Sequence, residues 1–206
     1  MEQELIFAVD IDGVLRDNLS KMVEIYNHYF DDNKTREDVV DFKCENIFPR
    51  IEKETGVKAS EWFFQLHSAE VFEDSLPFEG ALEAFKGLQQ YGKVIILSYQ
   101  KTTENKIQAL KWLEKNGFPT TDVCFLKDKT LLHTDYLIDD NDWNFKNTNV
   151  KHAVLIDAPY NQFIRLCDIA NSANKDKLLT VERNSSLLGF YNEFKYLKNS
   201  IFMKNI

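Results

Sequence analysis

Short, wholly apolar runs alternate along this chain with stretches whose apolar residues recur every three or four positions. Apolar runs bounded by polar residues are typical of strands buried on both faces, and the wider spacing is typical of helices. The runs predict strands at residues 5–9, 93–98, 122–126, 135–139, 152–157 and 178–182. The wider spacing predicts helices at residues 18–30, 77–91, 103–116 and 185–199.

The order of these elements predicts an α/β fold with a Rossmann-like parallel sheet sandwiched by helices, because buried strands that alternate with amphipathic helices favour parallel pairing. Residues 31–75 interrupt the alternation. They show two or three short helical patterns and are unusually rich in aromatic residues. We therefore expect residues 18–76 to form a small helical cap inserted after the first strand, and residues 1–17 and 77–206 to form the core.

Four of the predicted strands end in side chains that can act on a phosphate or a metal. In chain order, these side chains are Asp10 and Asp12, Ser98, Lys127 and Lys129, and Asp139 and Asp140. Ligands bind at the carboxyl ends of the strands in an open parallel sheet, so we expect these groups to meet in one crevice. Each alone is explained as a turn residue, a helix cap or a solvated charge; their joint occurrence indicates a site.

The chemistry of these groups favours phosphoryl transfer with a metal. Four carboxylates in one crevice would repel one another unless a divalent cation lay among them. Ligation by oxygen alone selects a hard ion such as Mg²⁺. A carboxylate that follows the first strand can attack phosphorus, and a second one, two residues on, can transfer protons to and from the leaving oxygen and water.

Composition narrows the class of protein. The chain has 206 residues, of which 44% are apolar and 28% charged, as expected for a globular protein with a sizeable core. Its net charge of −8 argues against binding to nucleic-acid polymers, which requires clusters of Lys and Arg. Three widely separated cysteines, no signal-peptide pattern and no apolar run near the roughly 18 residues of a membrane span predict a cytoplasmic protein without membrane attachment.

The motifs resemble those of a known superfamily. The stretches "DIDGV", "VIILS", "KDKT" and "YLIDD" resemble, in order, the four motifs of the haloacid dehalogenase-like phosphatases. Together with "PFEGALEAF" and "HAVLIDAPYNQ", they look most like those of the 5′(3′)-deoxyribonucleotidases. The resemblance implies a Mg²⁺-dependent enzyme that dephosphorylates nucleoside monophosphates, with a small helical cap in the place of residues 18–76.

The resemblance also implies roles for the acidic residues. Asp10 matches the nucleophile, which is also a metal ligand. Asp12 matches the general acid and base, and its backbone carbonyl would lie on the metal. Asp140 matches a direct metal ligand, with Asp139 in support.

The phosphate-binding groups follow from the second and third motifs. The resemblance implies that Ser98, the amide of Tyr99 and Lys129 hold phosphate oxygens, and the spacing to the acidic pair selects Lys129 over Lys127. The family usually has Thr-Ser-Pro where this chain has Ser98-Tyr99-Gln100, so the hydroxyl is kept but the proline is not.

Recognition of the base is where this chain departs from the family. The family commonly has an aromatic residue just after its first motif, and this chain has Arg16 and Asn18 nearby instead. We interpret Arg16 as a surface or helix-capping charge rather than a contact to a second anionic group. Aromatic residues in the predicted cap either stack on a base or bury its small core. They are Phe42, Phe48, Trp62, Phe63, Phe64 and Phe72.

Other functions stay open on the sequence. The same chemistry would serve another small phosphate ester, such as a sugar phosphate. A receiver-like phosphoacceptor or binding module also combines an acidic pair, an Asp, a hydroxyl and a Lys. Receivers carry the acidic pair at the first strand and the acceptor at the third, which is the reverse of the order in this chain. The sequence is also compatible with a homo-oligomer.

Overall fold

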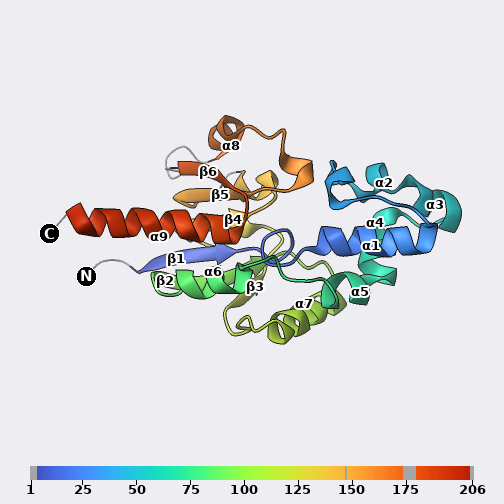
Figure 1. Cartoon of the computed structure of the whole chain (residues 1–206), viewed down its shortest axis with the longest axis horizontal. Helices are drawn as coiled ribbons and strands as arrows, with labels where there is room; N and C mark the ends of the chain where they lie inside the picture. The colour runs from blue at the N-terminus through green and yellow to red at the C-terminus, as the bar shows by residue number, and fades with distance from the viewer. Residues whose placement is uncertain (1–3, 147, 174–179, 205–206) are drawn as a thin grey trace.

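The sheet is parallel throughout. The computed structural model describes residues 4–146, 148–173 and 180–204, and within them six strands pair in the order β3-β2-β1-β4-β5-β6 (Figure 1). The strands are β1 (Leu5–Val9), β2 (Gly92–Ser98), β3 (Val123–Phe125), β4 (Tyr136–Asp139), β5 (His152–Ile156) and β6 (Thr180–Asn184). The predicted α/β class with a parallel sheet is confirmed.

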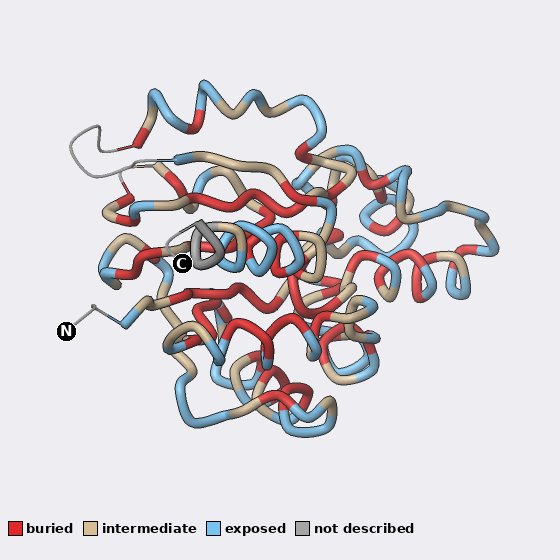
Figure 2. Tube along the Cα trace, turned by 60° about the vertical axis from the view of Figure 1, so that its left-hand side comes forward, coloured by how far each residue is buried: buried red, intermediate tan, exposed pale blue. Residues whose placement is uncertain are grey.

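Alternate residues of the central strand face opposite sides of the sheet. Phe7 and Val9 join the apolar cluster under three helices, whereas Ala8 joins a smaller cluster with Ile169 and Phe145 on the other face. The three helices are α6 (Ala81–Leu88), α7 (Thr103–Lys115) and α9 (Leu187–Lys204), and the other face carries α8 (Leu166–Ser172) and η4 (Asp142–Phe145). Helices on both faces bury the central strands, whereas the edge strands β3 and β6 are only partly buried (Figure 2). No described helix, α9 included, combines the length and apolar character needed to cross a membrane.

One of the predicted boundaries shifts for a local reason. The helix expected at residues 77–91 begins only at Ala81, because Gly80 takes a left-handed conformation with φ of 71°. The sixth strand is described at Thr180–Asn184 and runs two residues past its predicted end, and residues 178–179 of the predicted range lie outside the described part of the chain.

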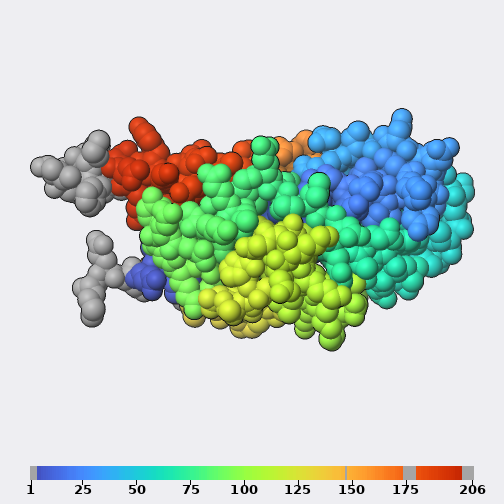
Figure 3. All heavy atoms as spheres, turned by 60° about the horizontal axis from the view of Figure 1, so that its bottom comes forward, coloured from blue at the N-terminus to red at the C-terminus, as the bar shows by residue number. Residues whose placement is uncertain are grey.

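The segment between β1 and α6 is helical and has an apolar cluster of its own. Its elements are α1 (Asn18–Phe30), η1 (Arg36–Asp38), α2 (Cys44–Ile47), α3 (Pro49–Thr55), α4 (Ala59–Glu61), η2 (Trp62–Leu66) and α5 (Ser68–Glu73). Tyr26, Phe48 and Phe63 are buried at its centre. We call this segment the helical lobe. It lies beyond the carboxyl ends of the strands, at one end of the molecule (Figures 1 and 3).

The two chain segments that join the helical lobe to the sheet run side by side. The Asp17 N–H donates to the Leu76 carbonyl at 2.9 Å, and the Phe78 N–H donates to the Leu15 carbonyl at the same distance. Arg16 lies between these two hydrogen bonds along the first segment. The pairing holds both connections together directly above the end of β1.

Candidate active site

The topology places the site above β1 and β4. Val9 of β1 pairs with Ile96 of β2 on one side and with Ile138 of β4 on the other. From β2 the chain goes on to β3 at one edge of the sheet, and from β4 it goes on to β5 and β6 at the other edge. Because the connections leave in opposite directions, a crevice opens at the carboxyl ends of the strands between them. Asp10, one residue past Val9, therefore lies beside Asp139, and its N–H donates to the Ile138 carbonyl at 3.0 Å.

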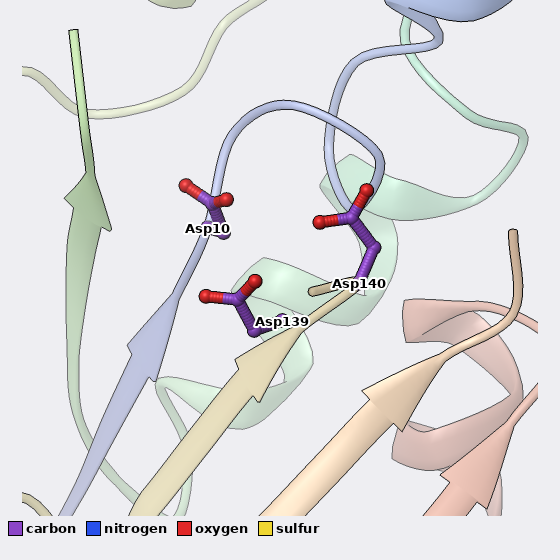
Figure 4. Close-up of side chains that lie close together, drawn as sticks. All are labelled: Asp10, Asp139 and Asp140. Atoms are coloured by element: carbon purple, nitrogen blue, oxygen red, sulfur yellow. The ribbon is translucent and has the colours of Figure 1, made fainter. Parts of the chain in front are cut away.

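Three carboxylates gather at this point, as Figure 4 shows. Asp10, Asp139 and Asp140 are all buried, and one carboxylate oxygen of each lies within 4.8 Å of the others. The buried Lys129 ammonium contacts two of them, at 3.0 Å from Asp10 Oδ2 and 2.6 Å from Asp139 Oδ2. One ammonium beside three carboxylates leaves the cluster with excess negative charge when all are ionised.

The electrostatics of the acidic cluster reflect that excess. Burial, reinforced by the carboxylates of Asp139 and Asp12 and opposed by Lys129, raises the pKa of Asp10 to about 6. Burial, together with repulsion from the carboxylates of Asp139 and Asp10, raises the pKa of Asp140 well above its usual value. Burial disfavours the Lys129 ammonium, but the Asp10 and Asp139 carboxylates outweigh it and raise the pKa of Lys129. A divalent cation would relieve the repulsion among the carboxylates.

The carboxylate oxygens of Asp139 and Asp10 differ in their hydrogen-bond partners. Asp139 accepts at Oδ1 from the Asn141 N–H and the Asn144 amide, both at 3.0 Å, and at Oδ2 from Lys129. Asp10 Oδ1 is buried and has no hydrogen-bond partner among the described residues. An unpartnered buried carboxylate oxygen is costly, and it marks the position where a cation would gain most.

Asp140 is fixed by the loop that follows β5. Its carboxylate oxygen Oδ2 accepts from the Tyr160 hydroxyl, and its backbone carbonyl accepts from the Asn161 amide at 2.8 Å. On the other side it lies against Gly13, where an added Cβ would come within 1.8 Å of Asp140 Oδ2. Gly13 also has a positive φ of 77°, so both its backbone and its missing side chain allow the loop after β1 to pass this close.

Asp12 points into a different environment. Its Oδ1 accepts from Arg16 Nε at 2.9 Å, and Arg16 Nη2 lies 2.8 Å from the same oxygen, off the line of a hydrogen bond. Its Oδ2 accepts from the Gln100 amide at 2.9 Å, and that amide nitrogen lies 3.3 Å from Ser98 Oγ. Arg16 is fully buried, so its interpretation as a surface or capping charge is wrong.

The predicted phosphate-binding residues lie on one cavity of about 630 Å³, which also reaches the helical lobe. Ser98 ends β2 and is buried, and Tyr99 follows it with a half-exposed side chain. Lys129 is buried between two carboxylates, whereas Lys127 is exposed at the cavity's edge. The structure therefore brings Asp10, Asp12, Ser98, Tyr99, Lys129 and Asp140 together on this cavity.

The aromatic residues of the helical lobe divide into two sets. Phe42, Phe64 and Phe72 line the cavity. Phe48, Trp62 and Phe63 belong to the buried cluster of the lobe and do not line it. Phe72 belongs to that buried cluster as well. The explanation that the aromatic residues bury the lobe's core therefore holds for Phe48, Trp62, Phe63 and Phe72, and stacking on a base stays a prediction for the residues that line the cavity.

A family model described as "5′ nucleotidase, deoxy (pyrimidine), cytosolic type C protein" matches residues 4–184. The chain belongs to this family. It is 25% identical over 156 residues to a Chlorobaculum tepidum protein that carries the provisional name 5′(3′)-deoxyribonucleotidase, covering 69% of this chain and 73% of the relative. The resemblance to haloacid dehalogenase-like phosphatases is therefore confirmed.

Solved structures show the same fold at low sequence identity. A haloacid dehalogenase-like hydrolase from Streptococcus pneumoniae superposes with a TM-score of 0.57 at 13% identity, over 94% of this chain and 100% of the other. A hydrolase of the same superfamily from Deinococcus radiodurans, solved with bound phosphate and sodium, gives a TM-score of 0.52 at 10% identity, over 89% and 91%.

Sequence reasoning missed three residues of this nucleotidase-family site. Gln100 was noted as a departure from the family's motif and given no role, yet it is buried against Asp12. Tyr160 lies within the quoted stretch "HAVLIDAPYNQ" and holds Asp140. Asn144 follows the acidic pair by four residues and holds Asp139. A polar residue two to five positions past a predicted strand end was the available signal in each case.

Proposed function

We propose that this protein is a Mg²⁺-dependent phosphomonoester hydrolase that dephosphorylates nucleoside monophosphates through an aspartyl-phosphate on Asp10. One observation carries the proposal: a buried carboxylate with an unpartnered oxygen lies among Asp139, Asp140 and Lys129, at the end of a large cavity. Membership of the 5′ nucleotidase family supports the same chemistry.

The donor set fits Mg²⁺. Asp10 Oδ1 has no partner among the described residues, Asp140 is held beside it, and carboxylate oxygens are what a hard cation prefers. Asp10 and Asp140 would bind the ion directly together with the backbone carbonyl of Asp12. Asp139, whose oxygens already accept from Lys129 and Asn144, would support them. The bound ion would neutralise charge on the transferring phosphoryl group.

The residues of the chain take the remaining roles. A carboxylate oxygen of Asp10 attacks phosphorus in line with the leaving oxygen. Asp12 gives its proton to that oxygen and then accepts a proton from the water that hydrolyses the aspartyl-phosphate. Ser98, the Tyr99 amide and Lys129 donate to phosphate oxygens and offset their charge.

The cavity supports a nucleotide as the substrate. Phe42, Phe64 and Phe72 line it, and nucleobases stack well on aromatic faces. The matched family and the Chlorobaculum relative are both named for deoxynucleotides, which favours this substrate over a sugar phosphate. The helical lobe, residues 18–76, would act as a cap domain that closes over the substrate and excludes water.

The proposed setting is the cytoplasm. Cys44, Cys124 and Cys167 are all free, as expected in a reducing compartment. The net charge of −8 disfavours a polynucleotide as substrate.

The test is a phosphate-release screen over nucleoside monophosphates and sugar phosphates, with Mg²⁺ or with EDTA. We expect turnover of at least one nucleoside monophosphate, loss of turnover in EDTA, and none with Asp10→Asn. Preferred turnover of a sugar phosphate would reassign the substrate. A phosphoryl group that forms on Asp10 but is not released would indicate a receiver-like module instead.

A further inference from the structure

We infer that Arg16 is the residue that aims the Asp12 carboxyl at the leaving group, and that it does so by tying Asp12 to the helical lobe. This inference rests on the proposed function, in which Asp12 is the general acid. Asp12 and Arg16 are four residues apart on the loop after β1, and the loop brings their side chains into direct contact.

Arg16 is held too firmly to be a solvated charge. Its side chain is fully buried. Its Nη1 donates to the Phe72 carbonyl in the helical lobe at 2.7 Å. Its guanidinium carbon lies 4.8 Å from the centre of the Phe72 ring and 5.2 Å from that of Trp112 in α7. Contacts with Phe72 of the helical lobe and Trp112 of α7 therefore fix the position of the Arg16 side chain.

That position selects which oxygen of Asp12 faces the substrate. Arg16 engages Oδ1, while Oδ2 lies on the side of Gln100, whose amide nitrogen also approaches the Ser98 hydroxyl. Ser98 is a proposed phosphate-binding residue, so Oδ2 is the oxygen nearer to the bound phosphoryl group. A residue that locks the rotamer of a catalytic acid in this way is a positioning residue.

The step that depends on this aim is the first one. As an Asp10 oxygen bonds to phosphorus, the bond from phosphorus to the substrate oxygen breaks, and the proton on Asp12 passes to that oxygen. A nucleoside must receive this proton in order to leave. A p-nitrophenolate leaves as a stable anion and needs none, so a badly aimed Asp12 should slow only the nucleoside.

The experiment is single-turnover release of the leaving group with excess Mg²⁺-loaded enzyme, comparing thymidine 5′-monophosphate with p-nitrophenyl phosphate. This measurement excludes the later hydrolysis step, in which Asp12 acts as a base. The test variant is Arg16→Lys, which keeps the charge but loses the planar group that reaches both Asp12 and Phe72. Arg16→Gln is a second variant, and melting temperatures confirm that each is folded.

The matched control is Arg36→Lys. Arg36 lies at the same junction, 3.3 Å from Asp17 and over the Phe78 ring at 5.5 Å, and none of its described contacts involves Asp12. We expect the control to release both leaving groups at the wild-type rate.

We expect Arg16→Lys to slow thymidine release by about tenfold or more and p-nitrophenol release by less than about threefold, because general acid catalysis contributes roughly 10²–10⁴-fold. In an Asp12→Asn background, Arg16→Lys should cause no further loss, since no acid is left to aim. Equal slowing of both substrates, or of neither, overturns the inference while leaving the proposed function intact. Failure of the wild type to release phosphate from any nucleoside monophosphate of the screen overturns the proposed function.

Discussion

Asp10 and Asp12 are separated by one residue, yet their carboxylates have opposite surroundings. Asp10 lies in the acidic cluster with Asp139 and Asp140, where one lysine is shared and one oxygen has no partner among the described residues. Asp12 has both oxygens engaged by donors from its own chain, Arg16 and Gln100. The two carboxylates line one cavity and have different hydrogen-bond partners there.

Under the proposed function, this difference explains how one loop supplies two kinds of chemistry. The acidic cluster around Asp10 holds three carboxylates and one ammonium, so a cation would complete it; in the proposed function this places the nucleophile beside the metal. Both oxygens of the Asp12 carboxylate already accept hydrogen bonds, and in the proposed function this carboxylate transfers protons instead of binding the metal. Carboxylates with contrasting environments at one site are the usual basis for a division of roles.

The largest expected effect is on turnover by Asp10→Asn. Because the amide cannot attack phosphorus, we expect the rate to fall by roughly 10⁴-fold or more, as when other covalent nucleophiles are removed. Phosphate release under saturating Mg²⁺ measures it. A variant that keeps more than a tenth of the wild-type rate would show that Asp10 is not the nucleophile.

Lys129→Met should come next, because it strips the acidic cluster of its only described internal cation. Removing one partner of a buried ion pair costs about 3–5 kcal/mol, so we expect that loss of unfolding free energy together with most of the activity. The control is Lys127→Met, an exposed side chain whose replacement should change stability by less than about 0.5 kcal/mol. Denaturant unfolding compares the two, and equal effects would refute the assignment of Lys129.

Magnesium should stabilise the protein by binding to the acidic cluster, and this stabilisation should not depend on the Asp12 carboxylate. At a concentration one hundred times its dissociation constant, a ligand adds about 2.7 kcal/mol, which for a chain of this size raises the melting temperature by about 5–10 °C. Thermal melts with and without Mg²⁺ measure the shift. Asp140→Asn should lose it and Asp12→Asn should keep it. The reverse pattern would show that the metal binds the Asp12 carboxylate and not the acidic cluster.

The smallest expected effect is a difference in unfolding free energy between Asp12→Asn and Asp10→Asn, measured without metal. Asp12→Asn should lower the unfolding free energy by about 1–3 kcal/mol, because it weakens the contacts of the buried Arg16 guanidinium. Asp10→Asn should not, because burial opposes the charge of Asp10 and raises its pKa to about 6. Urea unfolding near neutral pH compares the variants, and equal destabilisation would remove the contrast between the two sites.

Much of the fold and the membership of the candidate site could be predicted. The strands are short, apolar throughout and bounded by polar residues, so their positions follow from local composition. The residues that follow β1, β2 and β4 meet because parallel strands place all their carboxyl ends at one edge. The roles of those residues in turnover stay predictions. The burial of Arg16 could not be predicted, because nothing in the sequence around this charged residue signals that two aromatic rings will cover it.

By itself, the sequence determined the parallel sheet, the acidic strand ends and the helical segment between β1 and α6, since each depends on residue types over a short span. Only the tertiary structure decided which carboxylate pairs with which cation. Lys129 forms ion pairs with Asp10 and Asp139, and Arg16 donates a hydrogen bond to Asp12. The structure likewise decided that the Tyr160 hydroxyl, on the loop after β5, donates to Asp140. The Lys129–Asp10 and Tyr160–Asp140 contacts join segments distant in the chain. Asp12 and Arg16 are close in sequence, but Arg16 is covered by the Phe72 and Trp112 rings of other elements. These contacts depend on how packed layers stack above the sheet rather than on any local pattern.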